Sequence, residues 1–371
     1  MWGQGRCRNR IMNIQEVAKR ARVSGTTVSR ALNRVPTVDR RLAKRVWRAA
    51  AELGYYPNKL ARGLVLGRSR ILGLIVSDIT NPFFPEIIQS FEDAAVDHDY
   101  EILLVSTQHD HKRMEISVRR MIERRVDGVA VLTSGIEEEL LGQLQFRKLP
   151  LVLIDADSPP PGTSNLQIDY RRGIRQAVEH LAALRHDKIA FITGPLTLRS
   201  ALTRKNAFED SLREIGMHFD PQLVLEGDHT MEGGMCAFGA LIDKGLRPTA
   251  VMCSNDLSAI GVMREAYERG VSVPQELSVV GFDDVRIAQF IVPPLTSVRI
   301  SQAGIGRVAF NALFAELQRE KLSRDSTEYL LTTDLVLRSS TALAPGKGKS
   351  PATQTRASLP PEFDSGTGDE E

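Results

Sequence analysis

The sequence predicts an all-α helix-turn-helix head followed by an α/β body of two doubly wound parallel-sheet lobes. Short apolar stripes at helical spacing come first, and apolar strand-like runs alternating with helical patterns follow them. Positive charge is concentrated at one end, since residues 1–70 hold 17 lysines and arginines against 3 acidic residues, whereas residues 71–371 hold 31 against 43. Such clustering is typical of a nucleic-acid-binding end, although charge alone would also fit a solvated basic face.

Composition indicates more than one folded domain and an unexported protein. The chain has 371 residues and 42% hydrophobic content, which is enough for two or three domains with real cores. Its three cysteines, Cys7, Cys236 and Cys253, are scattered and odd in number, so neither a disulfide framework nor a zinc site is indicated. No run approaches the ~18 apolar residues of a membrane span, and no apolar segment follows the basic N-terminus. We therefore expect a cytoplasmic protein without a membrane partner.

Three short helices are predicted in the head, residues 13–57. Apolar residues at helical spacing mark residues 14–21, and Ser24 can N-cap a second helix. The tight connection between these two helices predicts a helix-turn-helix, whose second helix enters the major groove N-terminus first. A third helix is expected between Asp39 as N-cap and Gly54 as C-cap.

The second helix carries the candidate DNA-reading face. Its apolar stripe faces the core shared by the three helices, which leaves polar side chains on the outside. Hydroxyl, amide and guanidinium groups can contact phosphates and base edges, and arginine to guanine is the commonest specific pairing. The outer-face residues are Gly25, Thr26, Ser29, Arg30 and Asn33.

The segments that flank the folded parts are less regular. Residues 58–69 combine a potential helix cap, Asn58, with a one-turn apolar pattern and linker residues, so composition alone leaves open a short helix or an ordinary basic linker. The N-terminal residues 1–12 and the tail 344–371, which is rich in proline, glycine, serine and charge, are predicted to be disordered.

The body, residues 70–343, reads as alternating strands and helices, with helices expected for example at residues 85–96 and 256–269. Continuous Val, Ile and Leu strands between helices predict parallel sheets covered on both faces, and their number would overfill one sheet. The expected strands are residues 71–78, 101–107, 128–134, 151–157, 188–194, 250–256, 278–284, 295–301 and 328–335. Because the last two follow a complete second set, we expect the chain to return to the first lobe and cross back.

Polar residues gather at the carboxyl ends of these strands, where parallel α/β sheets bind ligands. Together with Phe83 and Phe84, which follow the first strand, they would suit a small polyhydroxylated or heterocyclic ligand. The strand-end residues are Asp78, Ser134, Asp155, Asn255, Asp256, Asp283 and Asp284. Any one of them is equally well explained as the cap of the following helix, so the prediction depends on the whole set.

The sequence gives no positive support for catalysis, a cofactor or a metal site. Residues 304–309, GIGRVA, formally match the dinucleotide-binding pattern but come near the end of the α/β region instead of opening it. The seven histidines show no metal spacing, and the strand-end carboxylates have no evident nucleophile or base beside them. We predict a binding protein with no cofactor and no metal. The alternatives are a cytoplasmic two-lobed enzyme, a solute-binding protein, and a constitutive DNA-binding protein without effector.

Several segments in order resemble the lactose-repressor and purine-repressor family of bacterial transcription regulators. They are NIQEVAKRARVSGTTVSRALN, ELGYYPNKLARGL, GLIVSDITNPFF, RRVDGVAVL, SNDLSAIGVMREAYERGVSVPQELSVVGFDD and PPLTSVR, and they span residues 13–341. The resemblance implies a homodimer that binds a palindromic double-stranded DNA operator and a small-molecule effector, most plausibly sugar-like, in a body similar to a periplasmic sugar-binding protein. It also implies a hinge helix at residues 58–64 that folds on DNA, with Leu64 wedged into the minor groove.

The resemblance further implies which residues make the contacts. Gly25, Thr26 and Arg30 match the main major-groove readers. Positions that contact phosphates or position the head and hinge on DNA are Ile14, Ser24, Thr27, Ser29, Asn33, Tyr55, Asn58, Leu60, Ala61 and Leu64. Effector-contacting positions are Phe83, Phe84, Ser134, Asp155, Ser200, Arg204, His229, Asn255 and Asp283. Among these, Arg204 and Asp283 are expected to grip vicinal hydroxyls or the polar edge of a ring.

Four positions depart from the family pattern. Gly25 leaves the first reader position without a side chain, so base recognition there should be relaxed. Gly63 in the hinge costs ~0.5–1 kcal/mol relative to alanine, which makes that helix more dependent on DNA. Leu198 stands where purine repressors place a base-recognising arginine, which argues against a purine effector, and His229 stands where relatives often have a stacking aromatic.

Overall fold

The computed structural model describes residues 13–32, 35, 37–56, 68–133, 136, 138–319 and 326–346. The chain divides after Ser69 into two compact units, a helical head and an α/β body. The predictions for the N-terminal residues 1–12, the hinge residues 58–64 and nearly all of the tail lie outside the described residues. No helix in the described ranges is long and apolar enough to cross a membrane.

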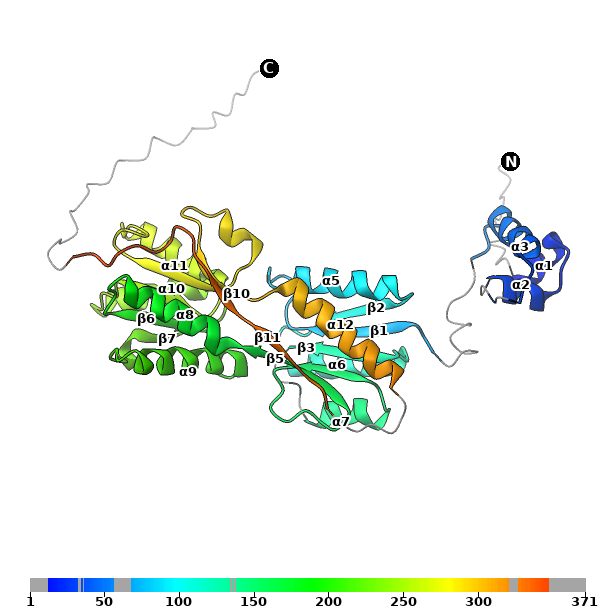
Figure 1. Ribbon diagram of the computed structural model, residues 1–371, viewed down its shortest axis with the longest axis horizontal. Coiled ribbons are helices and arrows are strands. Elements are labelled where there is room, and N and C mark those ends of the chain that lie inside the picture. Colours follow the sequence, from blue (N-terminus) through cyan, green and yellow to red (C-terminus); the bar gives the residue numbers. More distant parts are fainter. Residues whose placement is uncertain are drawn as a thin grey trace, which may run out of the picture. The chain divides into compact units, whose positions relative to one another are not determined.

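The head consists of three helices around one small core, as predicted (Figure 1). They are α1 (Ile14–Ala21), α2 (Gly25–Leu32) and α3 (Arg40–Glu52). Ser24 accepts a hydrogen bond from the N–H of Thr27 at 3.1 Å, and Asp39 accepts from the N–H of Arg41 at 2.9 Å, so both predicted N-caps are confirmed. The buried core residues are Val17, Ala18, Ala21, Val28, Ala31, Leu32, Val46, Ala49 and Ala50.

The body contains two six-stranded sheets, one in each lobe. The sheet of lobe 1 has the order β11-β5-β4-β3-β1-β2, and the sheet of lobe 2 has the order β12-β10-β9-β8-β6-β7. All pairs are parallel except β10 with β12. In lobe 1 the strands are β1 (Ile71–Val76), β2 (Glu101–Ser106), β3 (Gly128–Leu132), β4 (Leu151–Ile154), β5 (Thr163–Asp169) and β11 (Glu328–Thr332). In lobe 2 they are β6 (Ile189–Thr193), β7 (Val224–Glu226), β8 (Ala250–Cys253), β9 (Ser278–Asp283), β10 (Thr296–Arg299) and β12 (Asp334–Val336).

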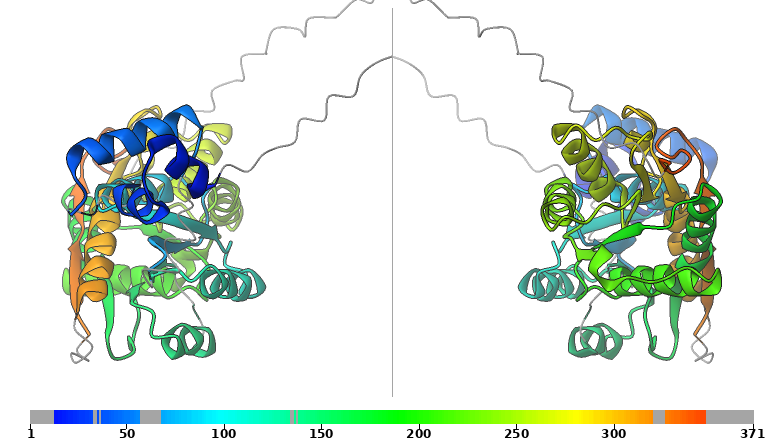
Figure 2. Two further views of the ribbon diagram at one scale, coloured as in Figure 1. Left: turned by 90° about the vertical axis from the view of Figure 1, so that its right-hand side faces the viewer. Right: turned by 90° about the vertical axis from the view of Figure 1, so that its left-hand side faces the viewer.

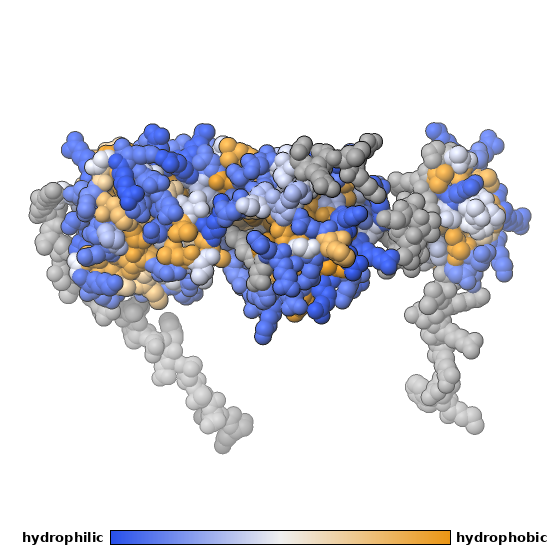
Figure 3. Space-filling view, turned by 90° about the horizontal axis from the view of Figure 1, so that it is seen from below, coloured by the Kyte–Doolittle hydropathy of each residue, from blue (hydrophilic) through white to orange (hydrophobic). Residues whose placement is uncertain are grey.

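Helices cover both faces of each sheet (Figures 1 and 2). One face carries α5 (Phe84–Asp97) and α12 (Gln302–Gln318) in lobe 1, and α8 (Tyr170–Ala183) and α9 (Arg199–Glu214) in lobe 2. The opposite face carries α6 (His111–Glu123) and α7 (Glu138–Phe146) in lobe 1, and α10 (Met231–Asp243) and α11 (Asp256–Glu268) in lobe 2. The first four helices share one apolar core that runs through both lobes, whereas each opposite face has its own. The outer surface in Figure 3 is mainly hydrophilic, with apolar residues in separate areas.

The chain passes between the lobes three times, so the predicted return and second crossing are confirmed (Figure 1). The strand expected at residues 295–301 is β10 of lobe 2, however, so the second set was not complete before it. The first passage follows β5, the second joins β10 to α12, and the third joins β11 to β12. Thr333 ties the third passage to the first, because its hydroxyl donates to the carbonyl of Asp169 at 2.6 Å and accepts from the N–H of Gly173 at 2.9 Å. Gly173 must be small here, since a Cβ would lie 2.3 Å from Cγ1 of Val298.

The strand predictions were incomplete in three places. β5 and β7 were not predicted, and the single strand expected at residues 328–335 divides at Thr333 into β11 and β12. Strands also end earlier than expected, for example β1 at Val76 and β8 at Cys253, so polar residues such as Asp78 and Asn255 follow the strands, whereas Asp283 is the last residue of β9. The register keeps those ends level, since Val76 pairs with both Ser106 and Leu132. The polar loops therefore collect at one edge of each sheet.

The glycine pattern at residues 304–309 has a packing role. It lies inside α12 and not at a strand-to-helix turn. A Cβ at Gly306 would lie 2.0 Å from Oγ of Ser90 and 2.3 Å from the carbonyl oxygen of Ile87, both on α5. Gly306 therefore allows α12 to approach α5 closely, which explains the glycine without a nucleotide.

Candidate DNA-binding surface and effector cleft

The outer face of α2 presents polar side chains, as predicted. Thr26 and Arg30 are exposed and Thr27 and Ser29 are half-buried, whereas Val28 between them is fully buried. Helical periodicity explains this alternation, since the stripe that folds the head leaves the other side of the helix to solvent. The surface combines hydroxyls with one guanidinium, which suits phosphates and base edges.

The acidic residues of the described head all cap helices or pair with an arginine. Glu16 closes a capping box with Asn13, and Asp39 caps α3. Glu52 accepts a hydrogen bond from Nε of Arg20 at 2.8 Å. These three carboxylates are all the acidic residues of the described head, so the remaining cations are not neutralised locally and the surface is left basic.

Several predicted DNA-contacting residues have a structural role as well. Ile14 and Tyr55 pack against the core of the head, which fits residues that position it. Gly25 lies close to α1, since a Cβ there would be 3.3 Å from Nε2 of Gln15. Arg45, which was not predicted, donates from Nε to the carbonyl of Ala21 at 2.8 Å and so caps α1. The predicted residues Asn33, Asn58, Leu60, Ala61 and Leu64 lie outside the described residues.

A cleft of about 380 Å³ lies between the lobes, at the carboxyl ends of the strands of both sheets. The structure brings together in its lining eight of the nine predicted effector residues. They are Phe83, Phe84, Asp155, Ser200, Arg204, His229, Asn255 and Asp283. Ser134 lies outside the described residues. The prediction that Asp256 and Asp284 belong to this lining is wrong, because neither lines the cleft.

Arg204 and Asp283 form a buried pair in the part of the cleft contributed by lobe 2. Their exposed fractions are 7% and 5%, and Nη2 of Arg204 lies 3.5 Å from Oδ1 of Asp283. Nη1 of Arg204 also donates to the carbonyl of Ser254. The guanidinium carbon lies 4.1 Å from the ring centre of Phe282 and 4.9 Å from that of Tyr170, so two rings cover the arginine. These contacts fix the guanidinium plane, while Nε has no hydrogen-bond partner.

Asp283 is held in an unusual environment. Its φ of +101° and that of Asp284, +53°, lie in the left-handed region, which is costly for residues other than glycine and frequent at functional sites. Burial raises the pKa of Asp283 to about 7, although Arg204 opposes this shift. The side-chain amide of Gln302 donates a hydrogen bond to the carbonyl oxygen of Asp283 at 2.5 Å and so anchors it. The protonation of the Asp283 carboxyl is thus set by two opposing influences, its burial and the charge of Arg204.

Asp155 of lobe 1 and Tyr170, the first residue of α8 in lobe 2, form a second polar pair, which joins the two lobes. The Tyr170 hydroxyl donates to Oδ2 of Asp155 at 2.5 Å, and the N–H of Ile168 donates to Oδ1 at 2.9 Å. Burial raises the pKa of Asp155, although the Tyr170 hydrogen bond opposes the shift. Tyr170 was missed because it follows β5, which was not predicted.

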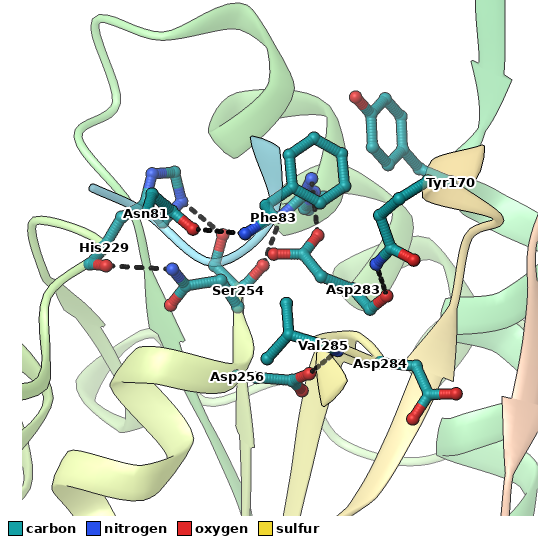
Figure 4. Close-up of polar contacts among 12 residues, drawn as sticks. Asn81, Phe83, Tyr170, His229, Ser254, Asp256, Asp283, Asp284 and Val285 are labelled. Atoms are coloured by element: carbon teal, nitrogen blue, oxygen red, sulfur yellow. Dashed lines mark hydrogen bonds and ion pairs between the residues drawn. The ribbon is translucent and has the colours of Figure 1, made fainter. Parts of the chain in front are cut away.

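His229 is neutral and held in place. Its Nε2 lies 2.9 Å from Oγ of Ser254, and its ring covers Gly194, where a Cβ would lie 2.0 Å from Nε2 (Figure 4). Burial lowers the pKa of His229 to about 3, and the charge of Arg204 adds to this effect. The ring therefore offers a flat, uncharged surface to the cleft.

The remaining strand-end residues are largely structural. Asn255 caps α11, accepting from the N–H of Ser258 at 3.0 Å, and also donates to the carbonyl of His229 at 2.9 Å. Asp256 is buried below the cleft, where it accepts from the N–H of Val285 at 2.8 Å (Figure 4). Asp284 pairs with Arg338 at 2.6 Å. For Asn255 the capping explanation is therefore correct, and the contact with His229 adds to it.

Asp78, which was predicted from its position after the first strand, lines the cleft as expected. The cleft also contains polar residues that were not predicted, namely Ser77, Thr80, Asn81, Gln108, His109, Thr133, Asp228 and Thr230. Gln108 and His109 come two and three residues after the end of β2, so the strand-end rule could have found them. Both have positive φ, of 51° and 56°. Burial lowers the pKa of His109 although Asp78 opposes the shift. Among the described residues, no group of three or more His, Cys, Asp and Glu side chains could hold a metal ion.

A basic helix-turn-helix head and a two-lobed body with a polar cleft together define a ligand-responsive DNA-binding transcription regulator. Two family descriptions match the chain: "Bacterial regulatory proteins, lacI family" over residues 13–58, and "Periplasmic binding protein-like domain" over residues 178–341. The chain is 33% identical to the HTH-type transcriptional repressor CytR of Escherichia coli (strain K12), covering 90% of this chain and 97% of that protein. It belongs to the lacI family of bacterial regulatory proteins.

Other similar proteins are also transcription regulators. The HTH-type transcriptional repressor PurR of Glaesserella parasuis serovar 5 (strain SH0165) is 33% identical, covering 89% of this chain and 98% of that protein. Among solved structures, the lac repressor dimer bound to operator and the anti-inducer ONPF superposes with a TM-score of 0.80 at 26% identity, covering 89% of this chain and 99% of that one. A complex of the transcriptional regulator CelR with cellobiose gives 0.68 at 28% identity, again covering 89% and 99%.

Proposed function

We propose that this protein is a repressor that binds a palindromic operator as a homodimer and changes its operator affinity when a small polyhydroxylated effector enters the cleft. The observation that carries the proposal is the presence, in one chain, of a basic head with a polar reading helix and a cleft in which lobe 2 presents the buried Arg204–Asp283 pair. The names and titles of the relatives support it, since they describe repressors, a dimer on an operator and a complex with cellobiose.

On the DNA side, we assign base reading to Thr26 and Arg30, because they are the exposed side chains of α2. Gly25 should read weakly for lack of a side chain. Contacts with phosphates, or positioning of the head, are assigned to Ile14, Ser24, Thr27, Ser29, Asn33 and Tyr55, and the hinge contacts to Asn58, Leu60, Ala61 and Leu64.

On the effector side, Arg204 and Asp283 are the principal contacts. Nε of Arg204 is buried without a hydrogen-bond partner, so an incoming oxygen would supply the acceptor it lacks. Asp155 faces them from lobe 1. The remaining contacts are assigned to Phe83, Phe84, Ser134, Ser200, His229 and Asn255.

Lobe movement would connect the two sites. A ligand held by residues of both lobes stabilises whichever lobe arrangement it fits best, and the three passages between the lobes form the hinge. Arg199 of lobe 2 and Asp157 of lobe 1 form an ion pair between the lobes, which adds a contact that depends on lobe spacing. A change in lobe spacing would alter operator affinity by linkage.

We assign no catalytic activity to the cleft. The only arrangement that suggests catalysis among its described residues is the contact between Ser254 and His229, which pairs a hydroxyl with an imidazole. Ser254 is 1% exposed and does not line the cleft. A histidine with a pKa of about 3 is also a poor base near neutral pH. The contact therefore serves to hold His229.

The test has two stages, both with the full-length protein. Selection from random duplex DNA should yield a palindromic sequence, and fluorescence anisotropy should show that it is bound at least 10³-fold tighter than unrelated DNA. Equal affinity for all sequences would instead favour a constitutive DNA-binding protein.

In the second stage, a thermal-shift screen of sugars, sugar phosphates, nucleosides and bases identifies ligands, and each hit is added to the operator complex. A ligand at 100 times its Kd should add ~2.7 kcal/mol to the free energy of unfolding. The Arg204→Lys variant, which keeps the charge but loses the fork, should bind operator normally and lose the ligand response. Chemical turnover of a hit would indicate an enzyme.

A further inference from the structure

The cleft has little positive charge to offer a ligand. Arg204 is the only lysine or arginine among its described lining residues. Its guanidinium already contacts Asp283 and the Ser254 carbonyl, and two aromatic rings cover it. The arginine can therefore direct a ligand oxygen but is largely neutralised by the protein.

The two histidines of the lining add no charge. Burial lowers the pKa values of both His109 and His229, the second to about 3. His229 is also engaged with Ser254. At neutral pH both rings are uncharged hydrogen-bonding and stacking surfaces.

Carboxylates, by contrast, enter the cleft from both lobes. Asp78 of lobe 1 accepts hydrogen bonds from the N–H and hydroxyl of Thr80 at 2.8 and 2.7 Å. Asp228 of lobe 2 does the same with Thr230 at 2.9 and 2.6 Å. Although burial opposes it, these hydrogen bonds lower the pKa of Asp228, so this residue stays ionised. With Asp155 and Asp283, the described lining contains four carboxyl groups and one arginine.

Helix N-termini, the other common anion binders, are mostly occupied. Thr230 caps α10 and Asn255 caps α11 through their side chains. The start of α5 uses Asn81 for the N–H of Phe83 at 3.0 Å. The start of α9 has no side-chain cap, so its first turn, beside Ser200, can donate to a ligand oxygen. A hydroxyl or ring oxygen satisfies those donors without bringing charge.

We propose, on the basis of the proposed function, that the cleft takes an uncharged ring compound with vicinal hydroxyls, a free sugar or a nucleoside, and rejects its phosphorylated form. The volume of about 380 Å³ lies at the lower end of the usual range of roughly 300–1,000 Å³, which suits one or two rings. Phe83 and Tyr170 supply aromatic faces, and Arg204 with Asp283 supplies a donor and an acceptor for neighbouring hydroxyls. A phosphate would face carboxylates from both lobes without a free cation.

The experiment measures Kd by calorimetry on the full-length protein with matched pairs: glucose and glucose 6-phosphate, ribose and ribose 5-phosphate, cellobiose and its phosphate ester, uridine and uridine 5′-monophosphate, and inorganic phosphate alone. We expect at least one uncharged compound to bind at least 100-fold tighter than its phosphorylated partner, and inorganic phosphate not to bind. Comparing the sugars with uridine shows whether the preferred ligand is a sugar or a nucleoside.

Two results would overturn the proposal. One is a phosphorylated compound that binds as tightly as its uncharged partner or tighter. The other is no binding of any uncharged compound by a protein that still binds its operator. In both cases specific operator binding, tested separately, would keep the DNA-binding part of the proposed function, and a phosphorylated effector that alters operator affinity would keep ligand control as well.

Two substitutions test the electrostatic cause. Asp78→Asn and Asp228→Asn each keep the oxygen that binds the following threonine but remove a negative charge from the cleft. Each should reduce the preference for the uncharged compound about tenfold. The matched control is Asp97→Asn, an exposed carboxylate at the end of α5 and outside the lining, which should leave the ratio unchanged. An unchanged ratio in both cleft variants would contradict the electrostatic cause.

Discussion

The head and the cleft handle charge in opposite ways. In the head, the three carboxylates are used to cap helices and to pair with Arg20, so cations remain at the surface. In the cleft, the arginine is used by the fold and carboxylates remain. The charge that a binding surface presents is thus the charge left over after folding, and this explains how one chain can attract DNA at one end and an uncharged molecule at the other.

The largest expected effect comes from replacing Arg204, the cleft arginine that already pairs with Asp283. Arg204→Met leaves Asp283 buried without its partner, which should lower the free energy of unfolding by ~3–5 kcal/mol. Arg213→Met on the same helix is the control, since that side chain is 62% exposed and its pairs should contribute at most ~0.5 kcal/mol. Urea unfolding of both variants compares them. Equal losses of unfolding free energy in the two variants would show that the contacts of Arg204 stabilise the fold no more than those of Arg213.

A second test uses the pH dependence of two neighbouring groups. The raised pKa of Asp283 means that the folded protein binds a proton more tightly than the unfolded chain, so this group makes stability fall as pH rises from about 4 to 7. The lowered pKa of His229 has the opposite sign, and stability falls as pH drops from 6.5 toward 3.

Relative to the wild type, Asp283→Asn should therefore gain stability between pH 5 and pH 8, and His229→Gln should gain it between pH 8 and pH 5, each by roughly 1–4 kcal/mol. Urea unfolding at several pH values measures both. The change with pH is the decisive quantity, because either substitution also carries a loss that does not depend on pH. Parallel pH profiles for the wild type and both variants would disprove these assignments.

In the head, we expect replacement of Arg30, which is exposed on α2, to affect DNA binding, and replacement of Arg45, which caps α1, to affect folding. Arg30→Ala should weaken operator binding by ~1–3 kcal/mol if it reads a base, relaxing sequence preference at one position. If Arg30 contacts only phosphate, the loss should be similar for all sequences and the salt dependence should fall by about one charge. Arg45→Ala, which loses the cap of α1, should act mainly on folding of the head. Anisotropy titrations at several salt concentrations separate these outcomes.

The smallest expected effect concerns the cap of the reading helix. Ser24→Ala removes the acceptor for the N–H of Thr27 and should destabilise the start of α2 by ~1 kcal/mol, whereas Ser24→Gly should cost only ~0.3 kcal/mol. Hydrogen exchange of the α2 amides in the full-length protein measures this local change. Faster exchange of the same size in both variants would show that the hydroxyl is not the cap.

The helices of the head were predictable because their signals are local, although the C-cap of α3 is Leu53 and not the predicted Gly54, which follows it with a positive φ. Ser24 and Asp39 mark helix starts, and apolar spacing over one or two turns fixes the inward face. The main strands of the body were recognisable as apolar runs. β5 was not, because five of its seven residues are polar and find partners in the fold, such as Ser164 with Glu316 at 2.7 Å. β7, with three residues, is too short to give a pattern.

The cleft was less predictable than the fold. The polar strand ends indicated where it lies, but which ends face it depends on loop geometry after the strand, and this separates Asp283 from its neighbour Asp284. Arg204 follows no strand and could be placed only through family resemblance. Tyr170 was lost together with β5. Pairing between distant segments is a tertiary property, so local patterns cannot show it.

The three passages between the lobes also limit how this protein can be divided or recombined. Each lobe is encoded by separate stretches of the gene, because α12 and β11 return to lobe 1 after most of lobe 2 has been made. No single truncation can therefore yield an intact lobe, and exchanging one lobe between two relatives would require a junction at every passage. The head lies in one continuous segment that ends at Ser69. A single junction there could give the same body a new DNA sequence to recognise.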